Sequence, residues 1–569
     1  MRFRVALNLL VGAAISLAWC APALAAATRW ETPVSVAHEV DNGTIAIDGA
    51  GAVTALFQTT SPKRVMISEA APGGDFSDPV PFGPECSLVP QIVGNDRGDA
   101  IGVWGEFDWD PCTGHYPPTV GLRIRNAGGA FGPVRSIPSA GSPSIAMNPS
   151  GGAVLAWMGP PAGKTIKVAS RLAGHDFGAS TTLAGPGSDF PGAGCENVLP
   201  RVPQAAINAR GDMVVVWSYW PYSWCPALKG GAFLSYRPAG GSWGKPEPLP
   251  GPGDSQAISL APNGAVTIVF SRHPNKENDT AAIARSPDGD YSDVESLGAR
   301  GDTRVTGNES GHALFWWVDG LGAVFQNYGA MQEPDGTLTR FKLLRAGFLM
   351  QLALDGTGNV LTAWTDAPSN DPPGSGQTVH AAMVNHLVLA DSPETLAPEV
   401  SGGGLDNLMG AVVNDAGGAA VAYVENSDYS VSPPTTELRV FRRASDTAPP
   451  AVESPPAGVG PAAVTLEATC DEICRVRSSL TVKESSSGQL RAAASPKPIV
   501  ALATRWLTRR RGRLARQTIG VGPKARKRIK DLQRAGVHLT AVAAVTAEDA
   551  WRNVRVVRRT VSLRKLLAG

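Results

Sequence analysis

Short runs of alternating apolar and polar residues recur along most of this chain, each in register with a glycine. Apolar residues six and four positions before the glycine, such as Ile45 and Ile47 before Gly51, point to one face of a predicted strand. A turn rich in Asn, Asp and Gly follows, and a second strand ends at an aromatic residue six positions after the glycine. The pairs are Gly51 with Phe57, Gly98 with Trp104, Gly151 with Trp157, Gly211 with Trp217, Gly264 with Phe270, Gly311 with Trp317, Gly358 with Trp364, and Gly417 with Tyr423.

The spacing of these glycines predicts the architecture. Successive glycines lie 47, 53, 60, 53, 47, 47 and 59 residues apart, the interval expected of one four-stranded propeller blade. Third strands are predicted at 120–125, 166–171, 232–237 and 438–442, and outer strands at 76–82, 131–137, 243–249 and 291–297. We predict an all-β fold with an eight-bladed β-propeller over 26–445. Seven blades is the alternative, because the sixth repeat diverges from 322 to 344 and the seventh has a weak outer strand.

The two ends of the repeat region complement each other. The eighth repeat has three strands before a proline-rich stretch, whereas 30–36 has the pattern of an outer strand with no blade before it. Pairing of these segments would close the ring and remove two unpaired sheet edges. We therefore expect the N-terminal strand to complete the last blade.

The turns before the outer strands carry a family resemblance. Ala239-Gly240-Gly241-Ser242-Trp243 is one such turn, and Asp288-Gly289-Asp290-Tyr291 is another. They resemble degenerate Asp-box (BNR) repeats of exported bacterial sialidase-like propellers, in which a small or acidic residue, a glycine and an aromatic residue stabilise the bend. That motif is structural in those families, so the resemblance implies the propeller fold and no catalysis by the turn itself.

The N-terminus predicts export. Arg2 and Arg4 precede an apolar run too short for a permanent membrane helix, and Ala23, Leu24 and Ala25 suit signal cleavage. We expect a signal peptide at 1–25, no transmembrane segment after its removal, and a secreted, extracellular or cell-envelope-associated product.

Six cysteines remain after that cleavage, an even number that suits disulfides in an oxidising compartment. Cys86 and Cys112 flank the second repeat glycine, and Cys195 and Cys225 flank the fourth in the same way. In a propeller both pairs would join loops on one face. Cys470 and Cys474 form a third pair, for which metal binding is the weaker reading because no further ligands lie near.

A second domain follows a proline-rich linker at 446–461. Strand patterns at 463–468, 478–483, 517–521, 537–546 and 554–563 suit an immunoglobulin-like β-sandwich over 462–569, with 524–535 as a short helix in an alternative reading. From 451 to the end, 23 Lys and Arg oppose 8 Asp and Glu, although the whole chain has a formal net charge of +1. This basic region could hold an anionic cell-envelope polymer, or simply be solvated or dock on the acidic propeller.

The loops joined by the first two cysteine pairs hold the candidate ligand site. Flat aromatic rings suit sugars or apolar groups, and carboxylates accept directional hydrogen bonds; the alternative is that these long loops only cover themselves. The candidate residues are Glu106, Asp108, Trp109, Asp110, Tyr116, Arg201, Tyr219, Trp220, Tyr222 and Trp224.

An enzymatic reading rests on less. Arg201 with Pro203 resembles the Arg-Ile-Pro phrase of sialidases, which would make Arg201 a carboxylate-binding arginine, but Pro90 and Pro143 occupy the same place in other repeats. Paired carboxylates among Glu106, Asp108 and Asp110 could serve a glycoside hydrolase. No metal, cofactor, phosphate-loop or serine-nucleophile motif is present, so we expect no cofactor and no nucleic-acid partner. The preferred reading is a non-catalytic propeller that binds an extracellular glycan or protein, with the basic domain as spacer or tether, and a sialidase-like glycoside hydrolase is the alternative.

Overall fold

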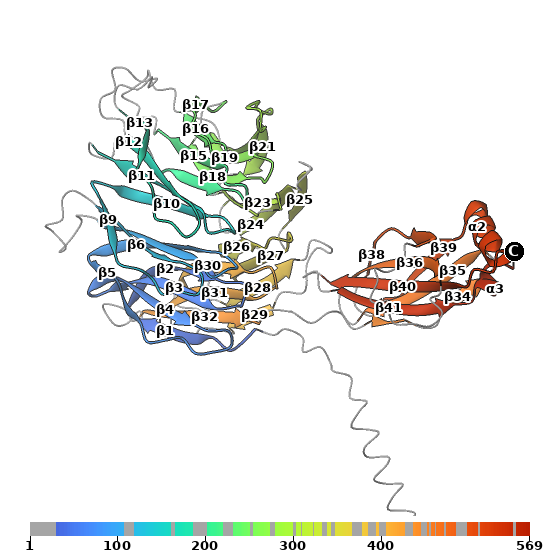
Figure 1. Ribbon diagram of the computed structural model, residues 1–569. Helices are drawn as coiled ribbons and strands as arrows, with labels where there is room; N and C mark the ends of the chain where they lie inside the picture. The colour runs from blue at the N-terminus through green and yellow to red at the C-terminus, as the bar shows by residue number, and fades with distance from the viewer. Residues whose placement is uncertain are drawn as a thin grey trace, which may run out of the picture. The chain divides into compact units, whose positions relative to one another are not determined.

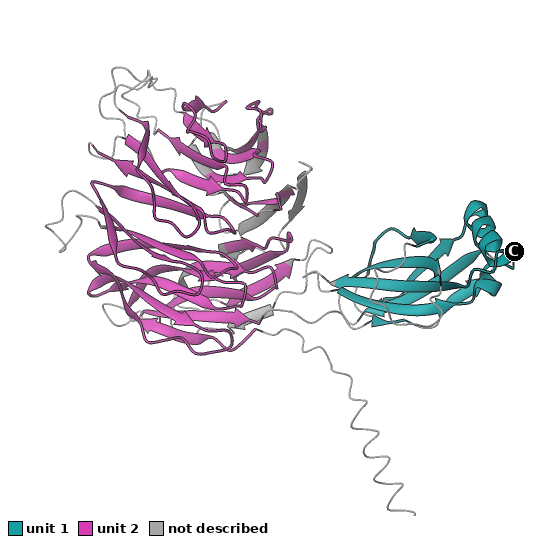
Figure 2. Cartoon of the chain, in the orientation of Figure 1, with its two compact units in different colours: residues 1–29, 446–569 teal, residues 30–445 magenta. Residues whose placement is uncertain are grey.

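A computed structural model describes most of the two regions expected from the sequence. It describes residues 30–106, 119–160, 165–185, 202–219, 231–250, 254–272, 279–299, 303–308, 310–321, 324–332, 338–342, 347–366, 378–384, 394–397, 405–426, 436–444, 452–454, 457–460, 462–470, 474–484, 498–509, 513–549 and 554–568. The chain divides into two compact units, Trp30–Ser445 and a second unit that comprises Met1–Arg29 and Asp446–Gly569 (Figure 2). No helix within the described residues is long and apolar enough to cross a membrane.

The described part of Trp30–Ser445 consists of antiparallel four-stranded sheets, seven of which take their strands in chain order (Figure 1). The first sheet consists of β2 (Val40–Ile47), β3 (Val53–Thr60), β4 (Lys63–Ala70) and β5 (Val80–Glu85), and the second of β6 (Ser87–Gly94), β7 (Ala100–Glu106), β8 (Thr119–Arg125) and β9 (Arg135–Pro138). The third sheet consists of β10 (Gly141–Met147), β11 (Ala153–Gly159), β12 (Thr165–Arg171) and β13 (Thr181–Ala184). The fourth sheet consists of β14 (Gln204–Ile207), β15 (Met213–Ser218), β16 (Ala232–Arg237) and β17 (Glu247–Pro248). The fifth sheet consists of β18 (Asp254–Leu260), β19 (Val266–Arg272), β20 (Asp279–Arg285) and β21 (Glu295–Ala299). The sixth sheet consists of β22 (Thr303–Gly307), β23 (Ala313–Leu321), β24 (Val324–Gln332) and β25 (Leu338–Lys342). The seventh sheet consists of β26 (Gly347–Leu354), β27 (Val360–Asp366), β28 (Val379–Val384) and β29 (Glu394–Ala397).

The remaining sheet of this unit takes its strands from both ends of the repeat region. Strands β30 (Leu405–Val413), β31 (Ala419–Asn426) and β32 (Thr436–Arg443) are completed by β1 (Val34–His38), which pairs antiparallel with β32. An isolated bridge between Trp30 and Arg443 extends this pairing. The first strand of each sheet contacts the first strand of the next, and β30 contacts β2. Such cyclic stacking of small sheets is the architecture of a β-propeller.

Apolar side chains fill the space between neighbouring sheets. One cluster joins Val154 of β11 to Val215 of β15, and another joins Leu56 of β3 to Trp104 of β7. The repeat aromatics lie in this core: Phe57, Trp104, Trp157, Trp217, Phe270, Trp364 and Tyr423 are between 0% and 4% exposed. The side chain of Trp317 lies outside the described residues.

The repeat glycines have a backbone conformation that explains their recurrence. All eight have a positive φ, between 76° and 94°, which L-amino acids with a side chain rarely adopt. Space is restricted at some of these positions as well: a Cβ at Gly151 would lie 2.7 Å from Oδ2 of Asp99 in the preceding sheet, whereas at Gly98 the nearest atom would be 3.7 Å away. Gly151 therefore serves both the turn and the packing of adjacent sheets.

The outer strands differ from the sequence prediction. Strands β5, β9, β17 and β21 begin four residues later than the predicted segments, so the aromatic residue belongs to the turn. Phe76 and Tyr291, for example, each make a single bridge to the third strand. Pro79, Pro133 and Pro246 follow three of these aromatics, and proline cannot donate a hydrogen bond to the ladder.

The described residues after Asp446 form two antiparallel sheets and two helices. One sheet contains β33 (Val452–Glu453), β34 (Gly458–Gly460), β35 (Ala463–Cys470) and β39 (Ala515–Gly520); the other contains β36 (Cys474–Glu484), β37 (Val500–Ala503), β38 (Leu507–Arg509), β40 (Leu539–Asp549) and β41 (Val554–Val561). Helices α2 (Pro523–Arg534) and α3 (Leu563–Leu566) bury Ile529 and Leu566 in the core that the two sheets share. The alternative helix expected at 524–535 is therefore present, and the five predicted strands occur with slightly different ends.

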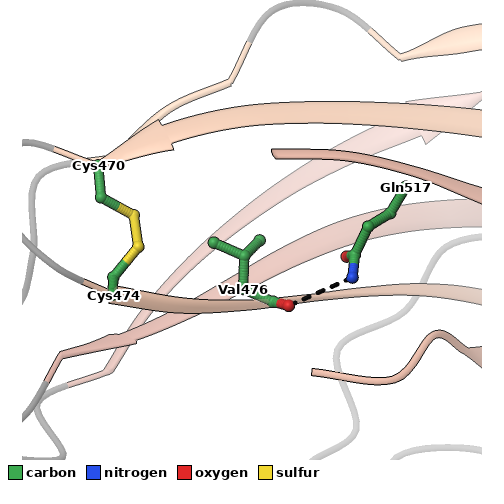
Figure 3. Close-up of a disulfide and its surroundings, with 4 residues drawn as sticks. All are labelled: Cys470, Cys474, Val476 and Gln517. Atoms are coloured by element: carbon green, nitrogen blue, oxygen red, sulfur yellow. Dashed lines mark hydrogen bonds between the residues drawn. A yellow bond between two sulfur atoms is a disulfide. The ribbon is translucent and has the colours of Figure 1, made fainter. Parts of the chain in front are cut away.

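A disulfide joins these two sheets. Cys470 at the end of β35 is bonded to Cys474 at the start of β36 (Figure 3). Nearby, Nε2 of Gln517 on β39 donates a hydrogen bond to the backbone oxygen of Val476 at 3.3 Å, again across the two sheets (Figure 3). No group of His, Cys, Asp and Glu side chains in the described residues is arranged to hold a metal ion.

Candidate functional site

The strand pairing fixes the end of the second sheet from which the first predicted loop emerges. Ser87 at the start of β6 pairs with Glu106 at the end of β7, which pairs with Thr119 at the start of β8. Cys86 precedes this row and is disulfide-bonded. Its expected partner, Cys112, lies outside the described residues. Glu106, the last described residue before 107–118, therefore lies beside Ser87, the residue that follows Cys86.

The fourth sheet has the same layout. Ser218 at the end of β15 pairs with Ala232 at the start of β16, so the segment between these strands leaves from that end. Cys195 and Cys225, the pair expected to brace it, lie outside the described residues.

Most of the predicted ligand residues also lie outside the described residues. Of Glu106, only the backbone is described, at the end of β7. Those outside are Asp108, Trp109, Asp110, Tyr116, Arg201, Trp220, Tyr222 and Trp224. Their convergence stays a prediction.

Tyr219 is the one candidate whose side chain is described, and it is buried. Only 2% of the residue is exposed, and its ring meets that of Phe233 edge to face with centroids 5.7 Å apart. It belongs to the apolar cluster between the third and fourth sheets, and this burial raises the pKa of its hydroxyl to about 12. A ring enclosed in this way offers little surface to a ligand, so we do not retain Tyr219 in the candidate site.

A second potential site lies at the opposite end of the sheets, where the turns after the first strands meet. A cavity of about 450 Å³ is bordered there by turn residues and by the ends of the inner strands. The turn residues include Asn95, Asn148, Asn208, Asn308, Asp355 and Asp415, and apolar side chains such as Met147, Ile207 and Leu354 contribute to the wall.

The asparagines at this end are engaged in bonds between sheets. Nδ2 of Asn95 donates to the backbone oxygen of Asn148 at 3.3 Å, and Nδ2 of Asn148 donates to that of Asn208 at 3.2 Å. Three further turns repeat the contact: Asn208 to Ala261 at 2.9 Å, Asn308 to Asp355 at 2.6 Å, and Asn414 to Asp48 at 2.8 Å. These amides stabilise the ring, which makes them poor candidates for ligand recognition.

Sequence reasoning missed this role of asparagine. Each of these five residues lies three positions before a repeat glycine, a recurrence visible in the sequence. The recurrence predicts only that each asparagine closes its own hairpin, and the structure shows this as well: Oδ1 of Asn95 accepts hydrogen bonds from the backbone nitrogens of Arg97 and Asp99. The bond to the next sheet could not be read from local spacing.

Asp355 occupies the asparagine position in the seventh sheet and is 1% exposed. Burial raises the pKa of its carboxyl to about 6. Its oxygens accept hydrogen bonds from Thr357 and Asn359 of the same turn, at 2.8 to 2.9 Å. These bonds occupy both oxygens, so the arrangement explains a structural cap better than a general base.

Solved structures that are similar to this chain share little sequence with it. No protein-family model matches the sequence, and no curated protein matches it. The Dos1 propeller is 9% identical with a TM-score of 0.43, over 72% of this chain and 94% of that chain. Polysaccharide lyase Uly1 is 7% identical with a TM-score of 0.41, over 74% of this chain and 100% of that chain. Hadza microbial sialidase Hz136 is 10% identical with a TM-score of 0.32, over 67% and 73%. The names of the last two proteins state different activities, and that of the first states none.

Proposed function

We propose that this protein is an exported, non-catalytic propeller that binds a carbohydrate or protein ligand at the face of the disulfide-braced loops. In this proposal 1–25 is a signal peptide, 26–445 is an eight-bladed propeller, 446–461 is a linker, and 462–569 is a basic immunoglobulin-like β-sandwich. The sandwich acts as a spacer or as a tether to the cell envelope.

The row Ser87, Glu106 and Thr119 carries the ligand-binding part of the proposal. Ser87, which follows the disulfide-bonded Cys86, pairs with Glu106 directly before 107–118, on a sheet whose core contains Trp104. A braced loop on a rigid frame loses little conformational entropy on binding, which favours recognition by its aromatic and acidic residues. The contacts of β30 with β2 support eight blades.

A glycan array probed with the full chain tests this function. Trp109→Ala and Trp220→Ala should each abolish binding to the glycans that the wild-type protein retains, because stacking on a flat ring contributes much of the affinity for a sugar. Trp506→Ala is the matched control, since Trp506 is 37% exposed but lies in the other unit. Binding that survives both propeller substitutions, or that is lost only in the control, would refute the proposed face.

A parallel assay separates binding from catalysis. Model glycosides incubated with the wild-type chain should remain intact. Hydrolysis that disappears in Glu106→Gln or Asp108→Asn would replace the binding proposal with a glycoside hydrolase that uses two carboxyl groups.

A further inference from the structure

Helix α2 concentrates positive charge on a short segment of its unit. Its 12 residues include six Lys or Arg and one acidic residue, Asp531. Asp531 forms an ion pair with Arg534 of the same helix at 3.6 Å. Among the residues that the structure describes, none forms an ion pair with Lys524, Lys527 or Arg528. All three side chains are exposed.

The arrangement of these cations opposes helix formation in the isolated chain. Lys527 and Arg528 lie three and four residues after Lys524, so the three side chains repel one another on one helix face. Lys524 also lies in the first turn of the helix, where the macrodipole disfavours positive charge, and no acidic residue lies in that turn. A bound anion would reduce both the repulsion between the cations and their unfavourable interaction with the helix dipole. Local rules are most often broken in this way at functional sites.

The same helix face lines an open cavity. Lys524, Lys527 and Arg528 border a space of about 630 Å³, together with Asp531 and three aliphatic residues of the unit. This volume lies within the range of pockets that take small organic groups. All three cations are exposed and border the same open space.

We propose that this face of α2 binds the phosphate groups of a soluble polyanion. A phosphate polymer presents about one negative charge per phosphate at close intervals, and Lys and Arg are both common phosphate donors, which suits several closely spaced cations. A lipid bilayer is disfavoured because the large exposed hydrophobic residues found among the described residues lie outside α2. The inference rests on the proposed tethering role of this unit and names the helix and the ligand chemistry that perform it.

Binding of the full chain to inorganic polyphosphate tests the assignment. The triple variant Lys524→Glu, Lys527→Glu and Arg528→Glu should bind roughly 100-fold more weakly, because each basic residue near an anionic surface contributes about a factor of five to ten. Wild-type binding should weaken steeply as salt is raised, and the salt dependence should be shallower in the variant.

A charge-matched control separates a site from net charge. Arg477→Glu, Lys483→Glu and Arg558→Glu change the same number of charges at exposed positions on β36 and β41. This control should bind nearly as well as wild type, and so should Lys524→Arg with Lys527→Arg. Circular dichroism checks that each variant is folded.

Three results would overturn the inference. Equal loss in the α2 variant and in the control would show a general charge effect, and undiminished binding in the α2 variant would place the ligand elsewhere. Equal or tighter binding to polygalacturonate, or to phosphatidylglycerol vesicles, would show that phosphate of a soluble polymer is not the preferred ligand. A wild-type chain that binds no polyanion would instead refute the tethering function itself.

Discussion

Replacing Asn208 with alanine tests whether the asparagine contacts hold neighbouring sheets together. Asn208 is 3% exposed, and its Nδ2 donates to Oδ2 of Asp212 at 2.8 Å and to the backbone oxygen of Ala261 at 2.9 Å. Its Oδ1 accepts a hydrogen bond from the backbone nitrogen of Asp212 at 2.9 Å. The substitution removes all three bonds and leaves their partners in a buried region.

The magnitude follows from these contacts. A buried hydrogen bond contributes about 1 kcal/mol to the free energy of unfolding, so the loss should be about 3 kcal/mol. One of these three bonds also acts on Asp212: burial raises the pKa of that carboxyl, but the hydrogen bonds from Asn208, Ala239 and Arg210 outweigh burial and lower the pKa. With an unfolding entropy of roughly 0.9 kcal/mol/K for a unit of this size, the melting temperature should fall by about 3 °C.

Asn263→Ala is the matched control for this experiment. Asn263 lies in the corresponding turn of the fifth sheet, is exposed, and accepts a hydrogen bond from Ala265 of its own turn. Its replacement should lower the melting temperature by about 1 °C or less. Differential scanning calorimetry of the full chain measures both. A shift for Asn208→Ala no larger than the control shift would refute the stabilising role of the inter-sheet bond.

Three further predictions concern the glycine, the closing strand and the buried acid. Gly151→Ala should cost about 2 kcal/mol in thermal unfolding, because its φ is 88° and the new Cβ would lie 2.7 Å from Oδ2 of Asp99. Gly174→Ala, with a φ of 74° and no atom within 4 Å of its Cβ, should cost about half as much, and equal losses would disprove the packing role. Deletion of 30–38 should give larger species than the intact chain in size-exclusion chromatography, because it exposes the edge of β32; an unchanged elution volume would contradict this. Burial raises the pKa of Asp355 to about 6, so the contribution of the protonated carboxyl to the free energy of unfolding is full near pH 4 and is lost as pH rises through 6. Between pH 4 and pH 7 the free energy of unfolding of Asp355→Asn should therefore rise by about 2 kcal/mol relative to that of the wild type. A difference between the two proteins that does not change with pH would contradict this.

The repeat itself could be predicted from the sequence because its physical causes are local. Glycine is favoured at position 211 because the turn needs a positive φ there, and an aromatic residue is favoured at Trp217 because that strand is buried on both faces. Each repeat has the same turn and the same buried strand, so both residue types recur at a fixed interval. The pairing of the N-terminal strand with β32 also followed from the sequence, since two incomplete sets of strands complemented each other.

Contacts between sheets could not be predicted in this way. Arg285 ends β20, and its guanidinium donates two hydrogen bonds to Glu247 of the preceding sheet at 2.9 and 3.0 Å, while lying over the ring of Tyr236. These partners are 38 and 49 residues away in the sequence, and no periodic pattern links them. For the same reason Tyr219 could be read as a loop aromatic from its neighbours, although it belongs to the apolar cluster between the third and fourth sheets.

The pairing of Val34 with Val440 has a consequence for how the chain acquires its fold. More than 400 residues separate the two partners, so the last sheet is incomplete until nearly the whole propeller region has been synthesised. Joining such distant segments carries a large loop-closure entropy, which makes ring completion a late and slow event. At high concentration the same N-terminal segment can complete the ring of a second molecule, and the propeller then exchanges strands between copies instead of within one.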